Sequence, residues 1–332
     1  MSVKQRIVVC PANSEKNWFK EHLSEFAQVR FCLEEAALSV DSDDSAHGDV
    51  QAQLADCDLV VYRRMRAQKM FPTQNPYLCF EWSPLRHPLS AWHYYIDSHG
   101  FSCESQAVPL FRNLSGGQRA QCHSTGSELT RLYESAVHGR TMSIIDEYVL
   151  KKSAYAVLVI LQVPSDDVLQ YFSGLKSGAD PHAALISHAE NRFQGKADIF
   201  VKPHPAFPRV SDAGKRALRT ATVIDPYCPI LPLLKLVDLV VTINSSCALE
   251  ALILGTPVIT LGDSTTSMLE FSYSAHDAMA AGTDKIPLPP SWQRDGQAFL
   301  GFLSESYGDW FPSPRLLHQA VSTALGAGVT GD

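Results

Sequence analysis

The sequence predicts an α/β protein made of two Rossmann-like domains, at residues 1–150 and 151–332. Short apolar, β-branched runs alternate with helix-like segments, which is the pattern of parallel sheets covered by helices. This alternation occurs twice, on either side of a quieter stretch at residues 138–153. A length of 332 residues, 45% of them hydrophobic and 19% charged, suits two domains with cores of their own.

The predicted elements follow this alternation in order. In the first domain we expect strands at residues 6–12, 29–33, 58–63, 77–81 and 93–97, with helices at 18–27 and 127–137. In the second domain we expect strands at 155–162, 197–203, 221–225, 238–244 and 256–262, separated by helices at 182–193, 231–237 and 245–255. The tail is expected to form two helices, at 295–311 and 313–325, that cross back over the domain junction.

Composition and charge exclude several classes of protein. A net charge of −7 gives no electrostatic support for a nucleic-acid partner. The eight cysteines have irregular spacings without CxxC, which favours buried free thiols in a reducing compartment over a zinc site or a disulfide framework. The apolar core of the N-terminus is too short for a signal peptide, and no stretch approaches the roughly 20 apolar residues of a membrane span. We therefore expect a cytoplasmic protein, with peripheral contact at the inner face of the membrane left open.

The strongest local signal is DLVVTINSSCALEALILGTPVITLG, in which a strand ends at Asn244 and a helix begins after Ser245 and Ser246. Free backbone N–H groups at a helix start, together with two hydroxyl groups, suit a phosphate. The plainer alternative is that a serine simply caps the helix. Glu250 lies one helical turn further on, where it could bind a ribose hydroxyl or face solvent.

A second polar segment, KPHP, follows the strand predicted at residues 197–203. Pro203 and Pro205 restrict the backbone and hold His204 in one orientation beyond the strand end. The imidazole of His204 can donate a hydrogen bond to a phosphate oxygen, and Lys202 can add positive charge. The alternative is an ordinary loop with a structural histidine. A second candidate phosphate site on the same predicted sheet favours the functional interpretation.

Two further strand ends carry carboxylates. In VLVILQVPSDDVLQYF, Gln162 precedes Asp166 and Asp167, which can cap a helix or act as nucleophile or general base. In YLCFEWSPLR, Glu81 and Arg86 can face a ligand or form a surface ion pair. The nearby arginines could line an anionic sugar or be solvated; they are Arg63, Arg64 and Arg66.

Taken together, these stretches resemble the capsule polysaccharide synthesis family, and within it the retaining Kdo transferases that build β-Kdo linkages in capsule and lipopolysaccharide. The segments that carry the resemblance are FEWSPLR, IDSHGFSCES, LQVPSDDVL, VKPHP and TINSSCALEALILGTPVITLG. Their order and approximate spacing match from about residue 58 to residue 262. The resemblance implies a GT-B-like fold, in which two Rossmann-like domains face a cleft.

The resemblance also implies a donor and a set of roles. CMP-Kdo would bind the C-terminal domain, with its phosphate between His204 and the helix start at Ser245 and Ser246. Asp166 would be the nucleophile, with Asp167 as the alternative, and Glu81 the acid/base that activates the acceptor. Further donor-binding residues would be Gln162, Lys202, Glu250 and Arg86.

The physical logic of such a reaction does not call for a divalent metal, because His204, Lys202 and helix N–H groups can stabilise the departing CMP anion. We therefore expect no cofactor, a nucleotide-sugar donor, and a glycan or glycolipid acceptor. Two alternatives stay open. One is a related two-domain transferase that uses a CDP-polyol or a UDP-sugar. The other is a catalytically silent nucleotide- or glycan-binding subunit.

Overall fold

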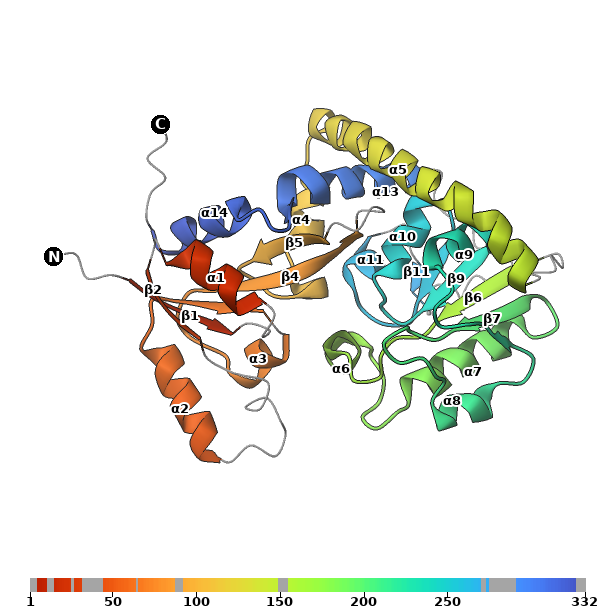
Figure 1. The fold of residues 1–332 in the computed structure, drawn as a ribbon, viewed down its shortest axis with the longest axis horizontal. Coiled ribbons are helices and arrows are strands. Elements are labelled where there is room, and N and C mark those ends of the chain that lie inside the picture. Colours follow the sequence, from red (N-terminus) through yellow and green to blue (C-terminus); the bar gives the residue numbers. More distant parts are fainter. Residues whose placement is uncertain are drawn as a thin grey trace. The chain divides into compact units, whose positions relative to one another are not determined.

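The computed structural model describes residues 5–10, 15–24, 27–31, 44–63, 65–86, 92–148, 155–269, 273–274 and 291–326 (Figure 1). The chain forms two compact units. Unit 1 comprises Met1–Ser83, Trp92–Gln106 and Tyr307–Asp332, and unit 2 comprises Pro84–Ala91 and Ala107–Ser306. Each unit is a sheet covered by helices, as the sequence predicted.

Unit 1 is built on a six-stranded sheet with the order β12-β5-β4-β3-β1-β2. Its strands are β1 (Gln5–Cys10), β2 (Ala27–Phe31), β3 (Leu59–Tyr62), β4 (Tyr77–Arg86), β5 (Trp92–Asp97) and β12 (Gly308–Trp310). Strand β1 pairs in parallel with β2 and β3, and β3 pairs in parallel with β4. Strand β12 runs antiparallel to β5.

The core of unit 1 lies between this sheet and two helices, α1 (Lys16–Leu23) and α14 (Arg315–Ala324). Trp18 of α1 is its aromatic centre, with ring centroids 5.7 Å from Phe80 and 5.3 Å from Phe311. The Trp18 indole N–H donates to the carbonyl oxygen of Pro312 at 3.0 Å. The C-terminal segment is thus part of the unit 1 core. The other helical segments among the described residues of the unit are α2 (Asp44–Ala55), α3 (Met65–Met70) and a 3₁₀ turn at Ser102–Glu104.

Unit 2 is built on a second six-stranded sheet with the order β11-β10-β9-β6-β7-β8. Its strands are β6 (Ala156–Ile160), β7 (Asp198–Lys202), β8 (Thr222–Val223), β9 (Leu239–Thr242), β10 (Val258–Thr260) and β11 (Tyr273–Ser274), and every neighbouring pair is parallel. Its helices are α4 (Ala107–Arg112), α5 (Gly116–Tyr148), α6 (Asp167–Phe172), α7 (Pro181–Phe193), α8 (Asp212–Ala217), α9 (Ile230–Leu236), α10 (Cys247–Ile253), α11 (Thr265–Met268) and α13 (Trp292–Phe302).

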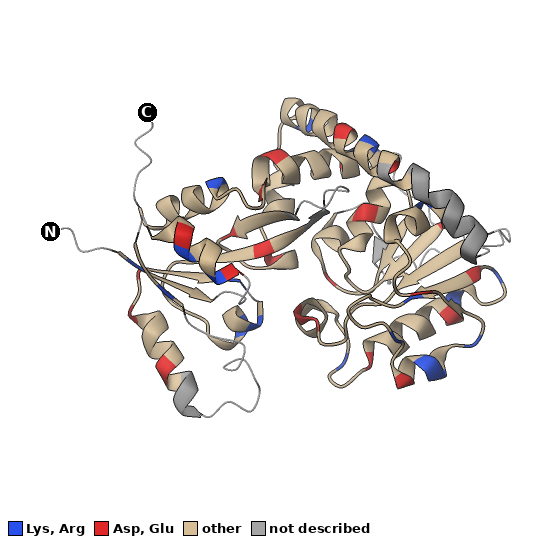
Figure 2. Cartoon of the chain, in the orientation of Figure 1, with Lys and Arg blue, Asp and Glu red and all other residues tan. Residues whose placement is uncertain are grey.

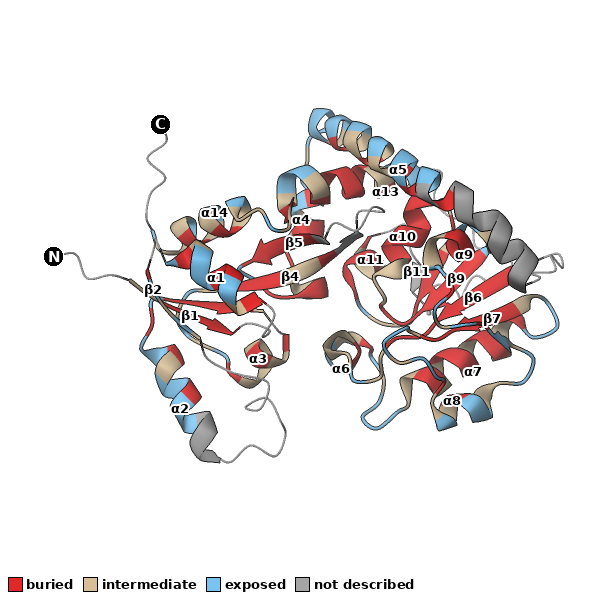
Figure 3. Ribbon diagram, in the orientation of Figure 1, coloured by how far each residue is buried: buried red, intermediate tan, exposed pale blue. Residues whose placement is uncertain are grey.

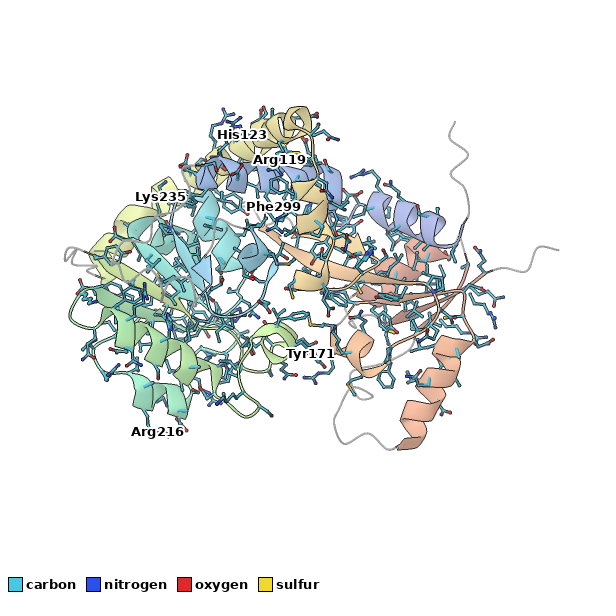
Figure 4. All side chains as sticks on the ribbon, turned by 180° about the vertical axis from the view of Figure 1, so that it is seen from behind. Arg119, His123, Tyr171, Arg216, Lys235 and Phe299 are labelled. Carbon is cyan, nitrogen blue, oxygen red and sulfur yellow. The ribbon has the colours of Figure 1, made fainter. Side chains whose placement is uncertain are left out.

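The central strands of unit 2 are buried on both faces, which is typical of a parallel sheet between helix layers (Figure 3). Helix α7 packs on β6, β7 and β9, and α10 packs on β9 and β10. Helices α9 and α10 contact each other, and α5 and α13 pack outside them. Nζ of Lys235 in α9 donates to Oε1 of Glu134 in α5 at 3.3 Å, and the buried Phe299 of α13 packs edge-to-face on Phe111 of α4. Lys235 and Phe299 are labelled in Figure 4.

Two glycines allow α5 and α13 to pack closely. A Cβ atom on Gly126 would lie 1.6 Å from the carbonyl oxygen of Gln297, and one on Gly301 would lie 1.8 Å from that of Cys122. Larger residues at either position would force the helices apart. This contact ties the long helix α5 to unit 2.

The two units differ from the predicted division at residues 150 and 151. Helix α5 continues to Tyr148 and belongs to unit 2, because it packs on α9 and α13. Of the predicted tail, the part up to Ser306 belongs to unit 2 and Tyr307–Asp332 belongs to unit 1.

The predicted tail helix at 295–311 needs a correction. Helix α13 ends at Phe302, a π-helical turn covers Leu303–Tyr307, and residues Gly308–Trp310 form β12. Gly308 lies so close to β5 that a Cβ atom there would be 2.0 Å from Cε1 of His93. Pairing with the open edge of the sheet therefore replaces the last part of the predicted helix.

Acidic and basic residues are interspersed along the described helices of both units (Figure 2). The described cysteines form no disulfide with one another; Cys10, Cys57, Cys79, Cys122 and Cys228 are buried, and Cys103 and Cys247 are half-buried. Cys32 lies outside the described residues. Within the described ranges, no helix is both long enough and apolar enough to cross a membrane.

Candidate functional site

Three strand ends meet at the carboxyl edge of the unit 2 sheet. Strand β6 pairs in parallel with β7 on one side and β9 on the other, so the segments that follow these strands are neighbours. They carry Gln162, the KPHP segment with His204, and Asn244 followed by the two serines. Ligands of open α/β sheets bind at this kind of edge.

Gln162 and Asn244 join two of these strand ends. The side-chain amide of Gln162 donates to Oδ1 of Asn244 at 3.0 Å, and its Oε1 accepts the backbone N–H of Asn244 at 3.1 Å. Asn244 also donates to the carbonyl oxygen of Val168 at 3.0 Å, at the start of α6. Both residues are buried. Gln162, expected to bind the donor, is thus engaged in bracing the loops.

His182 supports the same strand end from α7. Its Nδ1 accepts the backbone N–H of Ser211 at 3.1 Å, so the neutral ring carries its hydrogen on Nε2. Nε2 lies 2.8 Å from the carbonyl oxygen of Gln162, to which it donates. Neither His182 nor Asn244 was among the predicted site residues. The only signal for Asn244 was its place at a strand end before two serines.

His204 is held in one tautomer by its own loop. Its Nδ1 accepts the backbone N–H of Ala206 at 3.0 Å, and its carbonyl oxygen accepts the N–H of Phe207 at 2.9 Å. A neutral His204 ring therefore carries its hydrogen on Nε2, where it acts as a donor. The residue is half-buried.

Lys202 lies at the end of β7, as predicted, but its side chain contacts a backbone carbonyl of the protein. Its side chain is buried, and its Nζ donates to the carbonyl oxygen of Pro226 at 2.6 Å. Burial lowers the pKa of the Lys202 ammonium below its ordinary value. The ammonium thus holds the loop after β8 against the end of β7, and we do not assign it to a phosphate.

Asp166 is the N-cap residue of α6. Its Oδ1 accepts the backbone N–H of Val168 at 3.1 Å, which is the capping interaction that the sequence left as an alternative. Burial raises the pKa of the Asp166 carboxyl above its ordinary value, while the Val168 N–H and the charge of His204 act in the opposite direction. His204 is therefore close enough to Asp166 to influence the ionisation of its carboxyl group.

The start of α10 presents Ser245 and Ser246, both half-buried. The hydroxyl oxygen of Ser245 accepts the N–H of Cys247 at 3.3 Å, whereas the N-cap residue Ser246 makes no side-chain capping bond. Glu250 is only 3% exposed, so the solvated alternative for this residue is wrong.

The predicted residues of unit 2 thus fall into two groups. Asp166, His204, Ser245 and Ser246 retain partial exposure at the edge of the sheet. Gln162, Lys202 and Glu250 are buried beneath that edge, together with Asn244. The first group can touch a ligand, and the second group fixes the loops that carry it.

Glu81, in unit 1, is held by two donors. Its Oε2 accepts the hydroxyl of Tyr95 and the backbone N–H of Ser102, the latter at 2.9 Å. Ser102 has a φ of 52°, in the left-handed region that non-glycine residues rarely adopt. Burial, and next the charge of Glu81, raise the pKa of Tyr95 well above its ordinary value, so its hydroxyl stays a donor. Glu81 therefore has a fixed orientation.

A second pair, Asp97 and Tyr307, lies beside the first. The hydroxyl of Tyr307 donates to Oδ2 of Asp97, which also accepts the backbone N–H of Gln106 at 2.7 Å. The rings of Tyr95 and Tyr307 are 5.5 Å apart. A tyrosine from the C-terminal segment thus holds Asp97, and its ring contacts that of Tyr95, which holds Glu81.

Of the arginines proposed to bind an anionic ligand, Arg63 has a described side chain with partners in unit 1. Arg63 donates to Glu15 at 2.9 Å and lies over the rings of Phe80 and Trp82, so it serves the unit 1 core rather than an anionic sugar. Arg64 and the side chain of Arg86 lie outside the described residues. The described part of the chain contains no cluster of three or more His, Cys, Asp or Glu side chains suited to a metal ion.

Residues 111–281 match the family model described as capsule polysaccharide biosynthesis protein. This range is just over half of the chain and includes the ends of β6, β7 and β9. The chain belongs to this family. The family suggested by the sequence motifs is thereby confirmed.

One curated protein is similar to part of the chain. Protein FixF of Sinorhizobium fredii is 34% identical over 161 residues, which are 46% of this chain and 37% of FixF. The chain therefore spans little more than a third of the length of this curated relative.

Among solved structures, the KpsC β-Kdo 2,7 transferase of Thermosulfurimonas dismutans superposes with a TM-score of 0.59 at 14% identity, covering 96% of this chain and 99% of that one. The β-Kdo 2,4 transferase of KpsC from the same organism gives 0.48 at 15% identity, covering 89% and 90%. The first likeness shows a shared fold. It confirms the predicted α/β class with two Rossmann-like units.

Proposed function

We propose that this protein is a retaining glycosyltransferase that moves Kdo from CMP-Kdo to a glycan or glycolipid acceptor in bacterial surface polysaccharide synthesis. The observation that carries the proposal is the group of partly exposed side chains at one edge of the unit 2 sheet. It combines a carboxylate, an imidazole donor and two hydroxyls, on loops braced by buried side chains. Family membership and the shared fold support the same reading.

The first step that we propose is displacement of CMP by Asp166. A bond forms between Oδ2 of Asp166 and the anomeric carbon, and the bond from that carbon to the phosphate oxygen breaks. The electron pair leaves with CMP. His204 Nε2 and the hydroxyls of Ser245 and Ser246 donate hydrogen bonds to the departing phosphate, which stabilises charge that develops in the transition state.

The second step returns the sugar to an acceptor. An acceptor hydroxyl attacks the anomeric carbon, the bond to Asp166 breaks, and we propose that Glu81 takes the hydroxyl proton. Two inversions at one carbon give net retention, as in two-carboxylate sugar chemistry in general. The hydrogen bonds from Tyr95 and Ser102 keep the Glu81 carboxylate in one orientation for this transfer.

Intact-mass spectrometry after incubation with CMP-Kdo tests the proposal. Without an acceptor, we expect a protein species heavier by one sugar residue, absent in Asp166→Ala and retained in Asp167→Asn. Failure to detect it while CMP is being released would exclude the covalent step. An adduct formed only from a UDP-sugar or CDP-polyol would replace the proposed donor.

A further inference from the structure

Among the large hydrophobic residues that the structure describes, Tyr227 has the highest exposed fraction. Its exposed fraction is 69%, against 47% for Leu110, the next highest. A single exposed apolar residue is ordinary on a protein surface and by itself means little. Tyr227 differs in its position, because it lies in the loop at the carboxyl end of β8, beside the KPHP segment.

Hydrogen bonds hold the backbone of the loop before and after Tyr227. Before it, the carbonyl oxygen of Pro226 accepts the 2.6 Å hydrogen bond from the buried ammonium of Lys202. The backbone N–H of Tyr227 donates to Oδ1 of Asp225 at 2.7 Å, and the N–H of Cys228 donates to the carbonyl oxygen of Asp225 at 3.1 Å. Cys228 itself is buried. An exposed ring thus stands on a backbone that is held in place.

The same contacts place Tyr227 beside the candidate phosphate ligands. Lys202 ends β7 and is two residues from His204. Strand β8 pairs in parallel with β7, and the N–H of Ile224 continues that pairing by donating to Val201 at 2.9 Å. The Tyr227 loop and the end of β7 therefore meet at one buried ammonium.

The proposed nucleotide donor has a base as well as a phosphate. His204 and the two serines are proposed to bind the phosphate, whereas the base is a flat ring that binds best to an apolar surface. Aromatic side chains supply such a surface, because every base has a π face that can stack on them. Tyrosine does so at low entropic cost, since only two torsion angles are ordered.

We propose that the ring of Tyr227 stacks on the base of the nucleotide whose phosphate is bound by His204, which makes Tyr227 part of the nucleotide-binding site. This inference rests on the proposed function, since it takes a nucleotide-sugar as the donor. It assigns Tyr227 to binding of the base and gives it no part in the chemical steps.

Calorimetric titration with CMP and with ribose 5-phosphate tests the inference. Base stacking contributes about 1–3 kcal/mol, so Tyr227→Ala should weaken CMP binding roughly 5- to 150-fold. Ribose 5-phosphate has no base, and its affinity should be the same in the wild type and in Tyr227→Ala. Tyr227→Phe keeps the ring and should bind CMP within about twofold of the wild type.

The outcomes separate this inference from the proposed function. Equal CMP affinity in the wild type and Tyr227→Ala would overturn the stacking role and leave the transferase proposal intact. Equal loss of CMP and ribose 5-phosphate binding would also overturn it, since the substitution would then act on the phosphate site. If the wild type binds UMP but not CMP, the donor assignment fails, and a loss of UMP binding in Tyr227→Ala would still support stacking. A wild type that binds neither nucleotide contradicts both.

Discussion

The substitution Asp166→Asn should remove the proposed nucleophile while keeping the fold. In the structure, Oδ1 of Asp166 accepts the N–H of Val168 at 3.1 Å and so caps α6. Asparagine caps helices about as well as aspartate, so its side-chain oxygen can take over this bond. The exchange of the cap by itself should therefore change the free energy of unfolding by less than about 0.5 kcal/mol. Asp166→Ala should cost about 1 kcal/mol, or roughly 2–4 °C in Tm.

The stability difference between Asp166→Asn and the wild type should also depend on pH, in a direction set by the pKa of Asp166. Burial raises the pKa of Asp166 in the folded protein above its ordinary 3.8, so the folded state binds the proton more tightly than the unfolded state. The contribution of Asp166 to the stability of the wild type therefore falls as the pH rises from about 3.8 through the folded pKa. Asparagine does not titrate, so Asp166→Asn should be more stable relative to the wild type at pH 7 than at pH 3.

The assay combines thermal unfolding with release of CMP from CMP-Kdo in the presence of an acceptor. Loss of a nucleophile should lower kcat by at least about 1,000-fold, far more than any loss of folded protein explains. Asp167→Asn is the matched control, since its side chain is adjacent and has not been assigned to attack. If Asp166→Asn kept more than a tenth of the activity, or if only Asp167→Asn abolished it, the assignment of Asp166 would be wrong.

Three further predictions concern the fold and the reaction. Glu190 is buried, and its carboxylate accepts three backbone N–H groups and one hydroxyl; burial opposes ionisation, yet these bonds lower its pKa. In urea unfolding at pH 7, Glu190→Gln should lose about 2–4 kcal/mol. This difference should shrink as the pH falls from about 4.5 through the lower folded pKa, and a difference independent of pH would contradict this account. Gly126→Ala should destabilise the protein by about 1–3 kcal/mol in the same assay because of the Gln297 carbonyl, whereas Gly117→Ala, in open space on the same helix, should stabilise it by about 0.5–1 kcal/mol. Transferase activity should survive EDTA unchanged, and a loss restored by a divalent ion would refute metal independence.

The strands were the most predictable part of the fold. Runs such as LVVY at β3 and LVVT at β9 are buried on both faces of a sheet, so their sequence is apolar throughout. Strand β12 was missed, because GDW has no apolar alternation and exists only through pairing with β5. The extent of α5 was missed for a similar reason. Its stability comes from packing on α9 and α13, which local sequence does not reveal.

The candidate site could be predicted by location but not by the direction of each side chain. Polar residues after β6, β7 and β9 indicated the edge of the sheet correctly, because parallel strands end on the same side. The side chain of Lys202 is directed by the carbonyl oxygen of Pro226, to which it donates. The side chain of Gln162 is hydrogen-bonded to Asn244, which lies far along the chain. Such partners are set by the tertiary fold.

A crystal structure of the protein with CMP bound would address the central claim most directly. We predict phosphate oxygens within about 2.7–3.2 Å of Nε2 of His204 and of a hydroxyl of Ser245 or Ser246. Density for the nucleotide at any other edge or face of unit 2, with the imidazole and both hydroxyls still in solvent, would contradict the claim.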